Sequence, residues 1–581
     1  MDLEQRKLAE ELLFSEKTKA SFAKLLYWGV FDSRHVIPYP KVDESEKRRT
    51  EELVGKLKAF CEQEIDPAAI DRNARIPEPV IKGLGALGIL GLAIPERFGG
   101  LGMTQYAYCR AMEQLASHCG STALLVNAHQ SVGLKAIQLF GTEKQRDRWL
   151  RPLTTGDQLA AFCLTEPNAG SDAAGIETRA EFDPQKRVYR INGRKQWITN
   201  GSIAQVLTLM ARTEDDKVTA FIVTPDMPGF KVTAKALEKV GYRGTWTANL
   251  AFENMEVPEE NILGEKGKGL KIGLTVLDYG RTTFGATCTG VAKYLVGRAT
   301  DYAAKRLQFK QPLSDFLLVK QKLAEMSALA YALDASTYLT AGLIDANVED
   351  IMLETAILKV FASESLWKIL YDTMQIFGGR SFFTTEPFER LMRDARINMI
   401  GEGSNDVLRV FIAAVGLRDV GMELQSLLRA AKKPISGFAA LGKLAGTVLR
   451  RTEKPTVPIQ SPLFRNEARR LSRATRHFAF SVLRLLVKYK EAVVDEQLKL
   501  NRIAESAISI YTVTAVLSKI DSGLRRGSGD KSSPSRDLEP ARFYCNYALD
   551  KLDESLACLL ANNRDKEIGS LSDLLTGGRA Q

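Results

Sequence analysis

Apolar residues recur at three- and four-residue spacing along two long stretches of the chain. The first stretch covers residues 44–160, with segments such as EELVGKLKAF and YCRAMEQLA, and the second covers residues 276–425. This spacing places one apolar stripe on each helix, so both stretches are predicted to be helical. In the second stretch, six residues on one helical face predict the core of a helix bundle: Leu353, Ile357, Val360, Trp367, Tyr371 and Met374.

Between about residues 161 and 275 the pattern changes to short runs typical of β-strands, such as VYRINGRKQWIT, VLTLMAR, VTAFIVT, FKVTAKAL and ANLAFENMEV. Within the first run, Asn192-Gly193 predicts a hairpin turn. The spacing favours a compact antiparallel barrel or sandwich over parallel βαβ units. A Rossmann or P-loop fold is disfavoured because no GxGxxG follows a strand and no GK[ST] occurs.

Two polar segments divide the C-terminal part of the chain. Residues 429–455 contain seven Lys or Arg residues against one acid, Glu453, and mark a boundary before a further helical module over 462–581. Residues 523–540 are rich in Ser, Gly, Pro and charge, and are predicted to form a solvent loop. A length of 581 residues allows three or four domains, each with its own core.

Cysteine and histidine usage predicts neither disulfides nor a metal site. The seven cysteines show no CxxC spacing and are predicted to be buried thiols in a reducing compartment. The four histidines lack metal-ligand spacing, and His118 and His129 are expected to pack within an apolar helical stretch. The first residues resemble neither a signal peptide nor a transit peptide, and no uninterrupted apolar run is long enough to span a membrane.

Three short motifs occur in fixed order: LTEPNAGSD at 164–172, WITNG at 197–201 and GEGSNDVLR at 401–409. The first two are turn-rich, hydroxyl-bearing segments of the strand region, suited to contact a polar heteroaromatic ring. The third places Glu402 between two glycines, just before an apolar run that predicts a helix. A carboxylate flanked by glycines can be approached closely by a substrate.

Taken together, these motifs resemble the acyl-CoA dehydrogenase family. Further matching segments are KxGxRG at 239–244, VPxxNILG at 257–264, RxxF at 306–309, QIFGG at 375–379 and RDARI at 393–397. The resemblance covers about residues 44–420, and the segments on either side are similar to the very-long-chain branch. It implies a mostly α fold with a central small β-domain and an extra C-terminal helical domain.

The expected domains follow from this resemblance and from the composition of the chain. They are an N-terminal extension (1–43), an N-terminal helical domain (44–160), a β-domain (161–275), a C-terminal four-helix bundle (276–428), a basic amphipathic linker (429–461) and a C-terminal helical domain (462–581).

The family reaction is the FAD-dependent α,β-dehydrogenation of a fatty acyl thioester. By resemblance, Glu402 removes the α-proton, and its backbone N–H helps to bind the thioester oxygen. Each well-placed donor to that oxygen is worth roughly 2.7–4 kcal/mol, and desolvation can raise the pKa of the base by up to about 3–5 units. The family's other base position falls on Gly280, beside Arg281, so no competing carboxylate stands there.

The resemblance also assigns contacts with the cofactor and the substrate. Thr199 is expected to bond the flavin N5 and Trp197 to screen the ring, while Arg306 and Gln375 are expected to reach the FAD across a dimer interface. The expected FAD contacts are Phe162, Leu164, Thr165, Gly170, Ser171, Trp197, Thr199, Arg306, Phe309, Gln321, Gln375, Gly378, Gly379, Ser404 and Asp406. The expected substrate contacts are Ser171, Asp278, Arg281, Gly403, Gly133 and Ala136.

Four residues bear on specificity. Gly133 and Ala136 match small residues at the base of the acyl pocket and predict a preference for long chains, although tight helix packing explains them equally well. Gly401 replaces the aromatic residue that usually precedes the base, which opens the site to water or oxygen. Trp246 stands where a small polar residue is commoner, and either lines the pocket or packs.

The expected partners are acyl-CoA, an electron-transferring flavoprotein and a second copy of the chain in a homodimer. A net charge of +10 suits the phosphates of coenzyme A, an anionic membrane or nucleic acid. Nucleic acid is disfavoured because the basic residues are dispersed without interleaved aromatics. Apolar residues on one face of 438–449, flanked by Lys and Arg, predict a helix in a membrane interface, with a flexible linker or a buried helix as alternatives.

The expected location is cytoplasmic, peripheral on the inner membrane face, or on the matrix side if the chain is a processed eukaryotic protein. Two other functions stay open beside that of a long-chain dehydrogenase. One is an assembly or binding protein of the same fold, and the other is an acyl-CoA oxidase that uses oxygen to reoxidise the flavin.

Overall fold

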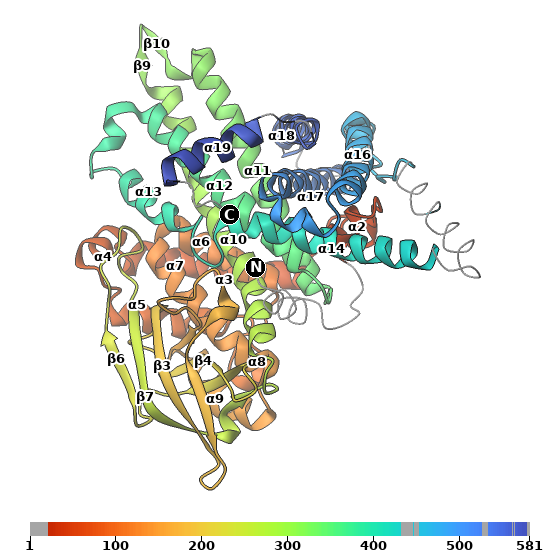
Figure 1. Cartoon of the computed structure of the whole chain (residues 1–581). Helices are drawn as coiled ribbons and strands as arrows, with labels where there is room; N and C mark the ends of the chain where they lie inside the picture. The colour runs from red at the N-terminus through yellow and green to blue at the C-terminus, as the bar shows by residue number, and fades with distance from the viewer. Residues whose placement is uncertain are drawn as a thin grey trace.

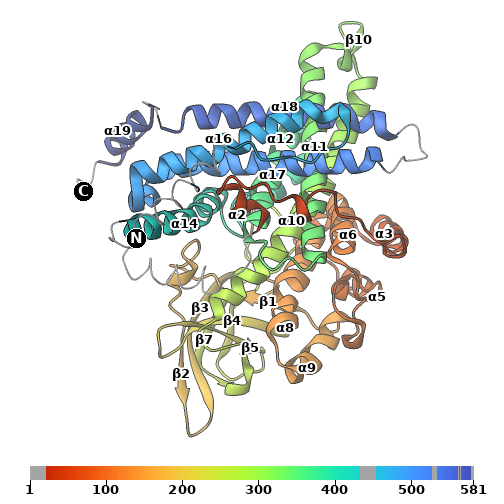
Figure 2. The same cartoon turned by 90° about the vertical axis from the view of Figure 1, so that its right-hand side faces the viewer.

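The computed structural model describes residues 21–577 apart from 432–445, 447–452, 526–532, 561 and 563. A β-domain and a group of short helices form one end of the molecule, and the long helices of the bundle rise from them (Figure 1). Helices of the C-terminal module cross the bundle at its side (Figure 2). The predicted fold class, helical domains around a central β-domain with an added C-terminal helical domain, is confirmed.

The N-terminal helical domain follows the predicted apolar spacing. Asp43, Asp66, Thr104 and Thr142 cap the first turns of four of its helices through their side chains, which satisfies backbone N–H groups there. The helices are α3 (Glu44–Glu64), α4 (Pro67–Asn73), α5 (Glu78–Ala86), α6 (Gln105–His118), α7 (Gly120–Val126), the π-helix η4 (Asn127–Leu134), α8 (Lys135–Phe140) and α9 (Glu143–Thr154), with the 3₁₀ turns η2 (Ile89–Gly91) and η3 (Glu96–Phe98).

The β-domain is one sheet in the order β6-β7-β3-β2-β4-β5-β8, with β1 paired to β4. Most neighbours are antiparallel, as predicted, whereas β1 and the end of β2 pair with β4 in parallel. The strands are β1 (Ala160–Cys163), β2 (Arg179–Asp183), β3 (Val188–Thr199), β4 (Val206–Arg212), β5 (Val218–Val223), β6 (Phe230–Ala234), β7 (Thr247–Pro258) and β8 (Ile262–Leu263).

The predicted hairpin turn at Asn192-Gly193 is wrong. Both residues lie inside β3, which pairs with β2 on one side and β7 on the other, and the register with β7 shifts between Ile191 and Gly193. Gly193 has φ 155, and a Cβ there would lie 2.4 Å from Oγ1 of Thr178. The dipeptide therefore forms a bulge whose glycine allows a close approach of the neighbouring strand.

The bundle consists of four long helices with short connecting elements. Its main helices are α10 (Gly269–Lys305), α11 (Leu317–Asp345), α12 (Met352–Phe377) and α14 (Asn405–Ala431). Between them lie the small hairpin β9 (Leu307–Gln308) and β10 (Gln311–Pro312), the 3₁₀ turns η7 (Leu313–Asp315) and η8 (Gly378–Phe382), and α13 (Phe388–Ile397). Of the stripe predicted as core, Leu353, Ile357 and Val360 are buried, but Tyr371 is 59% exposed.

The C-terminal module contains α16 (Arg465–Tyr489), α17 (Gln497–Arg525), α18 (Ser533–Ala557) and α19 (Arg564–Thr576), with the 3₁₀ elements η9 (Pro462–Phe464) and η10 (Lys490–Asp495). The predicted solvent loop over 523–540 is wrong at both ends, because α17 runs to Arg525 and α18 begins at Ser533. By length and composition α17 could cross a membrane, but 83% of its apolar window is buried, as in a core helix. The segment predicted to lie in a membrane, 438–449, falls outside the described residues apart from Gly446.

Residues 21–40, which include α2 (Phe22–Leu26) and the 3₁₀ turn η1 (Ser33–His35), lie between the bundle and the C-terminal module (Figure 2). On the bundle side, Ala23 N donates to Oε1 of Glu354 at 2.8 Å, and the Tyr27 hydroxyl donates to Ile412 O at 2.9 Å. On the other side, Tyr39 N donates to Oγ of Ser522 in α17 at 2.9 Å. This segment, here called the N-terminal strap, therefore joins the two units.

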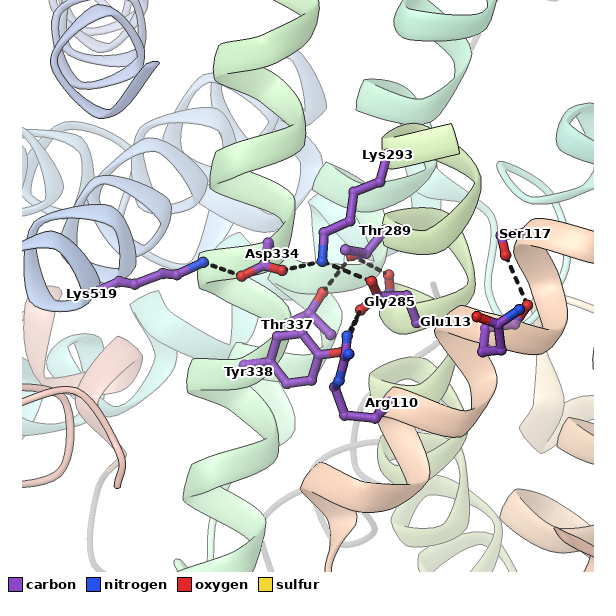
Figure 3. Close-up of polar contacts among 11 residues, drawn as sticks. Arg110, Glu113, Ser117, Gly285, Thr289, Lys293, Asp334, Thr337, Tyr338 and Lys519 are labelled. Atoms are coloured by element: carbon purple, nitrogen blue, oxygen red, sulfur yellow. Dashed lines mark hydrogen bonds and ion pairs between the residues drawn. The ribbon is translucent and has the colours of Figure 1, made fainter. Parts of the chain in front are cut away.

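A line of ion pairs also joins the C-terminal module to the rest of the protein (Figure 3). Asp334 of α11 accepts hydrogen bonds from Lys519 of α17 and from Lys293 of α10. Lys293 Nζ lies 2.7 Å from Oε1 of Glu113 in α6, and Glu113 also accepts from the Tyr338 hydroxyl. Four helices that are distant in sequence thus share one polar network.

Cysteines and histidines behave nearly as predicted. Six cysteines are buried, but Cys558, near the end of α18, is exposed, so the prediction of buried thiols is wrong there. His129 packs as predicted: it accepts from Ala160 N through Nδ1 at 2.9 Å, and Nε2 lies 3.0 Å from Leu153 O. Burial lowers the pKa of His129 to about 4, so this ring is neutral.

Candidate active site

Glu402 stands at the turn that precedes α14, in a strained backbone conformation with φ 57. Such a φ is uncommon for a side chain larger than asparagine and is tolerated where surrounding structure fixes it. The following Gly403 has φ 94, and its carbonyl accepts from Lys359 Nζ of α12 at 2.6 Å. Lys359 also donates to Oδ1 of Asn405 at 3.0 Å, so α12 fixes this turn.

The two carboxylate oxygens of Glu402 have different surroundings. Oε1 accepts a hydrogen bond from Nδ2 of Asn127 at 3.1 Å, whereas Oε2 is buried and has no hydrogen-bond partner among the residues that the structure describes. A Cβ on Gly280 would lie 3.2 Å from Oε2. Gly280, the family's alternative base position, thus faces the free oxygen of Glu402.

Burial raises the pKa of Glu402 above its ordinary value, and the nearby charges of Lys359 and Arg281 counteract this. Burial likewise lowers the pKa of Lys359 to about 8. The expected substrate residues Asp278 and Arg281 lie on α10 beside this site, 3.3 Å apart, and Thr355 Oγ1 donates to the same Asp278 oxygen at 2.7 Å. Burial raises the pKa of Asp278 to about 6.

The first two sequence motifs form one surface of the β-domain. Gln196 N donates to Thr165 O at 3.0 Å, which places WITNG against LTEPNAGSD. The buried ion pair between Lys195 and Glu166, 2.6 Å, and the bond from Lys195 Nζ to Leu164 O, 2.9 Å, fix the same junction. Half-buried Thr165 and Thr199 therefore stand on adjoining segments.

These motifs also approach the third one. Asn200 Nδ2 donates to Leu125 O at 3.1 Å, and Leu125 lies two residues before Asn127, the partner of Glu402. The sequence-predicted residues Thr199 and Glu402 are thus brought to the same part of the molecule through α7 and η4. Ser404 and Asp406 lie beside Glu402 at the start of α14.

The remaining predicted cofactor contacts lie at the other end of the bundle. Arg306, Phe309 and Gln321 lie around β9, β10 and the start of α11. Gln375, Gly378 and Gly379 line a pocket of about 550 Å³ at the end of α12. Lys322 of α11 pairs with Asp372 of α12 at 2.9 Å, so the two groups are neighbours.

Several features fit a bound FAD. At Gly170, Gly378 and Gly379, a Cβ would meet nothing within 4 Å, so the backbone is open to a ligand there. Trp197 has φ 58 and is 63% exposed, and an indole held in this way offers an apolar face to a flat ring. The half-buried hydroxyls of Thr165 and Thr199 can donate to ring heteroatoms without adding charge.

The residues assigned to specificity are placed as follows. Gly133 and Ala136 are buried, and a Cβ on Gly133 would lie 2.7 Å from Cβ of Ala160 in β1. Around Gly401 there is space, since the nearest atom to a Cβ there is Ile397 O at 3.7 Å. Trp246 packs half-buried against the core of the N-terminal helical domain.

Two residues of the site were not expected from the sequence: Asn127 and Lys359. Asn127 directly follows the apolar run ALLV, Lys359 interrupts the run AILKVFA, and each is at least 98% buried. A buried polar residue needs partners, so a polar residue next to or within an apolar helical run is the signal that could have identified both.

Comparisons with known proteins identify the family of this chain. Family models match in chain order: acyl-CoA dehydrogenase N-terminal domain at 47–157, middle domain at 161–255 and C-terminal domain at 267–417, then the ACAD9/ACADV C-terminal domain at 462–575. The very long-chain specific acyl-CoA dehydrogenase of Macaca fascicularis, a mitochondrial protein, is 35% identical over 98% of this chain and 89% of its own length.

Solved structures show the same relationship. An acyl-CoA dehydrogenase from Bacillus anthracis in complex with FAD has a TM-score of 0.79 at 28% identity, covering 94% of each chain. Butyryl-CoA dehydrogenase from Megasphaera elsdenii has a TM-score of 0.62 at 33% identity and covers 65% of this chain but 99% of its own. The shorter enzyme therefore spans only part of the present chain.

The chain belongs to the acyl-CoA dehydrogenase family of FAD-dependent oxidoreductases. Within that family, it carries the additional C-terminal domain described for the ACAD9/ACADV branch.

Proposed function

We propose that this chain converts long-chain fatty acyl-CoA to trans-2-enoyl-CoA in fatty acid β-oxidation and passes the electrons to an electron-transferring flavoprotein. The observation that carries the proposal is the carboxylate of Glu402: one oxygen is held by Asn127, and the other is buried and has no partner among the described residues. Burial strengthens it as a base by raising its pKa, and Gly280 leaves room beside the free oxygen.

In this mechanism Glu402 Oε2 takes the α-proton of the thioester. FAD, when bound, supplies the acceptor for the β-hydrogen. Gly403, with its positive φ, lets the substrate pass close to the backbone beside the base. Thr165, Trp197 and Thr199 bind and orient the flavin, while Lys359 and Arg281 limit the cost of an ionised Glu402 in a buried site.

A homodimer is part of the proposal. The end of the bundle that holds Arg306 and Gln375 exposes large apolar side chains, and monomeric proteins rarely expose many together. The most exposed are Phe309 at 89%, Phe382 at 84%, Leu317 at 80%, Leu318 at 74% and Phe383 at 64%. A second copy covering them would bring Gln375 and the pocket of α12 to its partner's cofactor.

Contact with an anionic membrane is the second part of the proposal. The exposed face of α16 carries Arg465, Arg469, Arg473, Arg484 and Lys488, here called the basic face of α16. The only acid in this helix, Glu467, is buried. Phe480 and Val487, 41% and 62% exposed, lie among these cations, a composition suited to anionic lipid.

This contact would bring the enzyme to poorly soluble substrates, from the cytoplasmic side of a bacterial membrane or the matrix side of a mitochondrial one. In the sequence, the basic segment 429–455 precedes α16, and we propose that both contribute to this contact.

An acyl-CoA oxidase is the alternative that one observation favours. The open space around Gly401 gives oxygen a route toward the base and the flavin site. A dehydrogenase should turn over with an artificial acceptor in the absence of oxygen, whereas an oxidase should turn over fastest in air.

The decisive test is an anaerobic chain-length series on the FAD-loaded protein, in which bleaching of the flavin band is followed after mixing with each acyl-CoA. We expect rapid bleaching with palmitoyl-CoA and longer chains, and slow bleaching with butyryl-CoA. No bleaching with any acyl-CoA would favour an assembly or binding protein, and butyryl-CoA as the best substrate would contradict the long-chain proposal.

A further inference from the structure

A chain of buried hydrogen bonds leads from α6 to Glu402. The Tyr108 hydroxyl lies 2.9 Å from Oγ of Ser131, which lies 3.0 Å from Oγ1 of Thr283. Thr283 Oγ1 donates to Oδ1 of Asn127 at 2.5 Å, and Nδ2 of Asn127 donates to Oε1 of Glu402 at 3.1 Å. The four residues before Glu402 are at most 2% exposed.

The orientation of the Asn127 amide follows from its two neighbours. Its nitrogen must face Glu402, because an amide oxygen there would meet a carboxylate that has no proton to donate. Its oxygen then faces Thr283, whose hydroxyl supplies the proton it needs. Thr283 Oγ1 also lies 3.0 Å from Gly280 O and 3.2 Å from Tyr279 O, but the contact with Asn127 is the shortest of the three. When Thr283 gives its proton to Asn127, it accepts from Ser131, and Ser131 in turn accepts from Tyr108. All donors thus point toward Glu402.

The π-helix η4 provides two residues of this hydrogen-bonded chain. Asn127 is its first residue, and Ser131 lies in the same segment, so one helical turn presents both side chains to a single hydroxyl of α10. π-Helical turns are rare and occur mostly at functional sites. Here the turn gives Glu402 a neutral hydrogen-bond donor, Asn127.

We propose that Asn127 is a positioning residue for the base, which it serves in two ways. It holds Oε1 of Glu402, so that Oε2, the oxygen without a partner, is presented over Gly280 to the substrate. By donating to the charged form, it also keeps more of Glu402 ionised at neutral pH. The inference rests on the proposed role of Glu402 as the base.

Other groups act on Glu402 and set the background for a test. Lys359 from α12 and Arg281 from α10 favour its ionised form, and burial opposes it. Burial raises the pKa of Tyr108 in α6, of Tyr242 in the β-domain and of Cys288 in α10, and the charge of Glu402 adds to each rise, so these three groups face the same region. None of these groups is changed in the variants below.

The test compares the FAD-loaded wild-type enzyme with Asn127→Leu, which has a similar volume but no donor, and with a matched pair at Thr283. Thr283→Val removes the hydroxyl that orients the amide, and Thr283→Ser retains it. The ionisation of Glu402 is followed directly, by infrared difference spectra across pH with Glu402→Gln as the reference. Anaerobic flavin reduction by palmitoyl-CoA is measured over the same pH range.

Loss of a hydrogen bond to a charged group should raise the titration midpoint of Glu402 in Asn127→Leu by about 1–2 pH units. Thr283→Val should give a smaller rise, and Thr283→Ser should match the wild type. The acid limb of the reduction rate should move by the same amount, while the substrate concentration for half-maximal reduction stays unchanged.

An unchanged midpoint in Asn127→Leu would overturn the inference, as would a loss of rate equal at all pH values. If Asn127→Leu does not bind FAD, Thr283→Val carries the same prediction. Failure of the proposed function is distinct, because a wild type that acyl-CoA does not reduce would still give the infrared midpoints.

Discussion

The ion pair between Lys519 and Asp334 joins a helix of the C-terminal module to the second helix of the bundle (Figure 3). The same carboxylate pairs with Lys293, which continues the network to Glu113 of α6. Burial opposes ionisation of Asp334, but Lys519 and Lys293 hold its pKa well below the usual range. One carboxylate therefore holds helices from three parts of the chain.

Asp334→Asn should loosen the C-terminal module, because it leaves two lysines facing each other without their shared carboxylate. Breaking a fully buried pair costs about 3–5 kcal/mol, and the partial exposure of both lysines reduces this to roughly 2 kcal/mol. We expect a lower Tm and faster proteolysis between the bundle and α16. Glu78→Gln, which breaks the exposed pair with Lys82, is the control and should leave both unchanged.

Glu402→Gln should abolish reduction of the flavin by acyl-CoA and leave FAD binding intact. The amide is nearly isosteric but cannot accept the α-proton, and loss of a general base typically costs about 10²–10⁴ in rate. The measurement is single-turnover bleaching of the flavin band with palmitoyl-CoA, beside the FAD content of each preparation. Near-wild-type bleaching by the variant would exclude Glu402 as the base.

Glu354→Gln should stabilise the protein at alkaline pH and not at acid pH. Burial raises the pKa of Glu354 to about 7, and its Oε1 accepts from Ala23 N of the N-terminal strap. When folding raises the pKa of an acid, the neutral form of that acid stabilises the folded protein most below the pKa of the unfolded chain. For Glu354 this contribution to the free energy of unfolding is lost as the pH rises through 7. The glutamine keeps the acceptor and is never ionised.

The stability gain from Glu354→Gln should therefore be on the order of 2–3 kcal/mol at pH 8, and close to zero near pH 4.5. Thermal unfolding of both proteins from pH 4.5 to 8 gives the comparison. A gain that is the same at both ends of this range would show that Glu354 does not titrate in the folded protein.

The double variant Arg469→Glu, Arg473→Glu should weaken binding to vesicles that contain phosphatidylglycerol. Each cation near an anionic surface is worth about 1 kcal/mol, so the loss should be at least about tenfold at low salt. The control is the double variant Lys56→Glu, Lys58→Glu, which makes the same change of charge at exposed positions of α3. This control should bind the vesicles as the wild type does. Equal sedimentation of the two double variants with vesicles would remove the basic face of α16 from the proposal.

Periodicity was sufficient to predict the two long helical regions and the strand region between them, because each long helix carries its own apolar stripe, whereas the fold class followed from the family resemblance. The hairpin turn predicted at Asn192-Gly193 was wrong, because pairing of β3 with strands on both sides outweighed the preference of the dipeptide for a turn. The exposure of Tyr371 could not be inferred either. The apolar stripe of α12 continues to Tyr371, but the neighbouring elements leave this side chain exposed.

At the candidate site, the sequence predicted Glu402 and the residues of the flavin motifs, which stand in short local patterns, and their roles stay predictions. It did not identify Asn127 or Lys359 as neighbours of Glu402, because their contacts join segments far apart in the chain. Which oxygen of Glu402 is free likewise depends on the packing of η4 against α10.

The N-terminal strap has a consequence for how this protein is made. The strap leaves the ribosome hundreds of residues before one of its two binding surfaces, on α17, is synthesised. Contacts between segments so distant in sequence form slowly. The apolar residues that the strap shares with the bundle and with α17 can therefore form one core only after α17 has been synthesised, so the strap takes its final place late in folding.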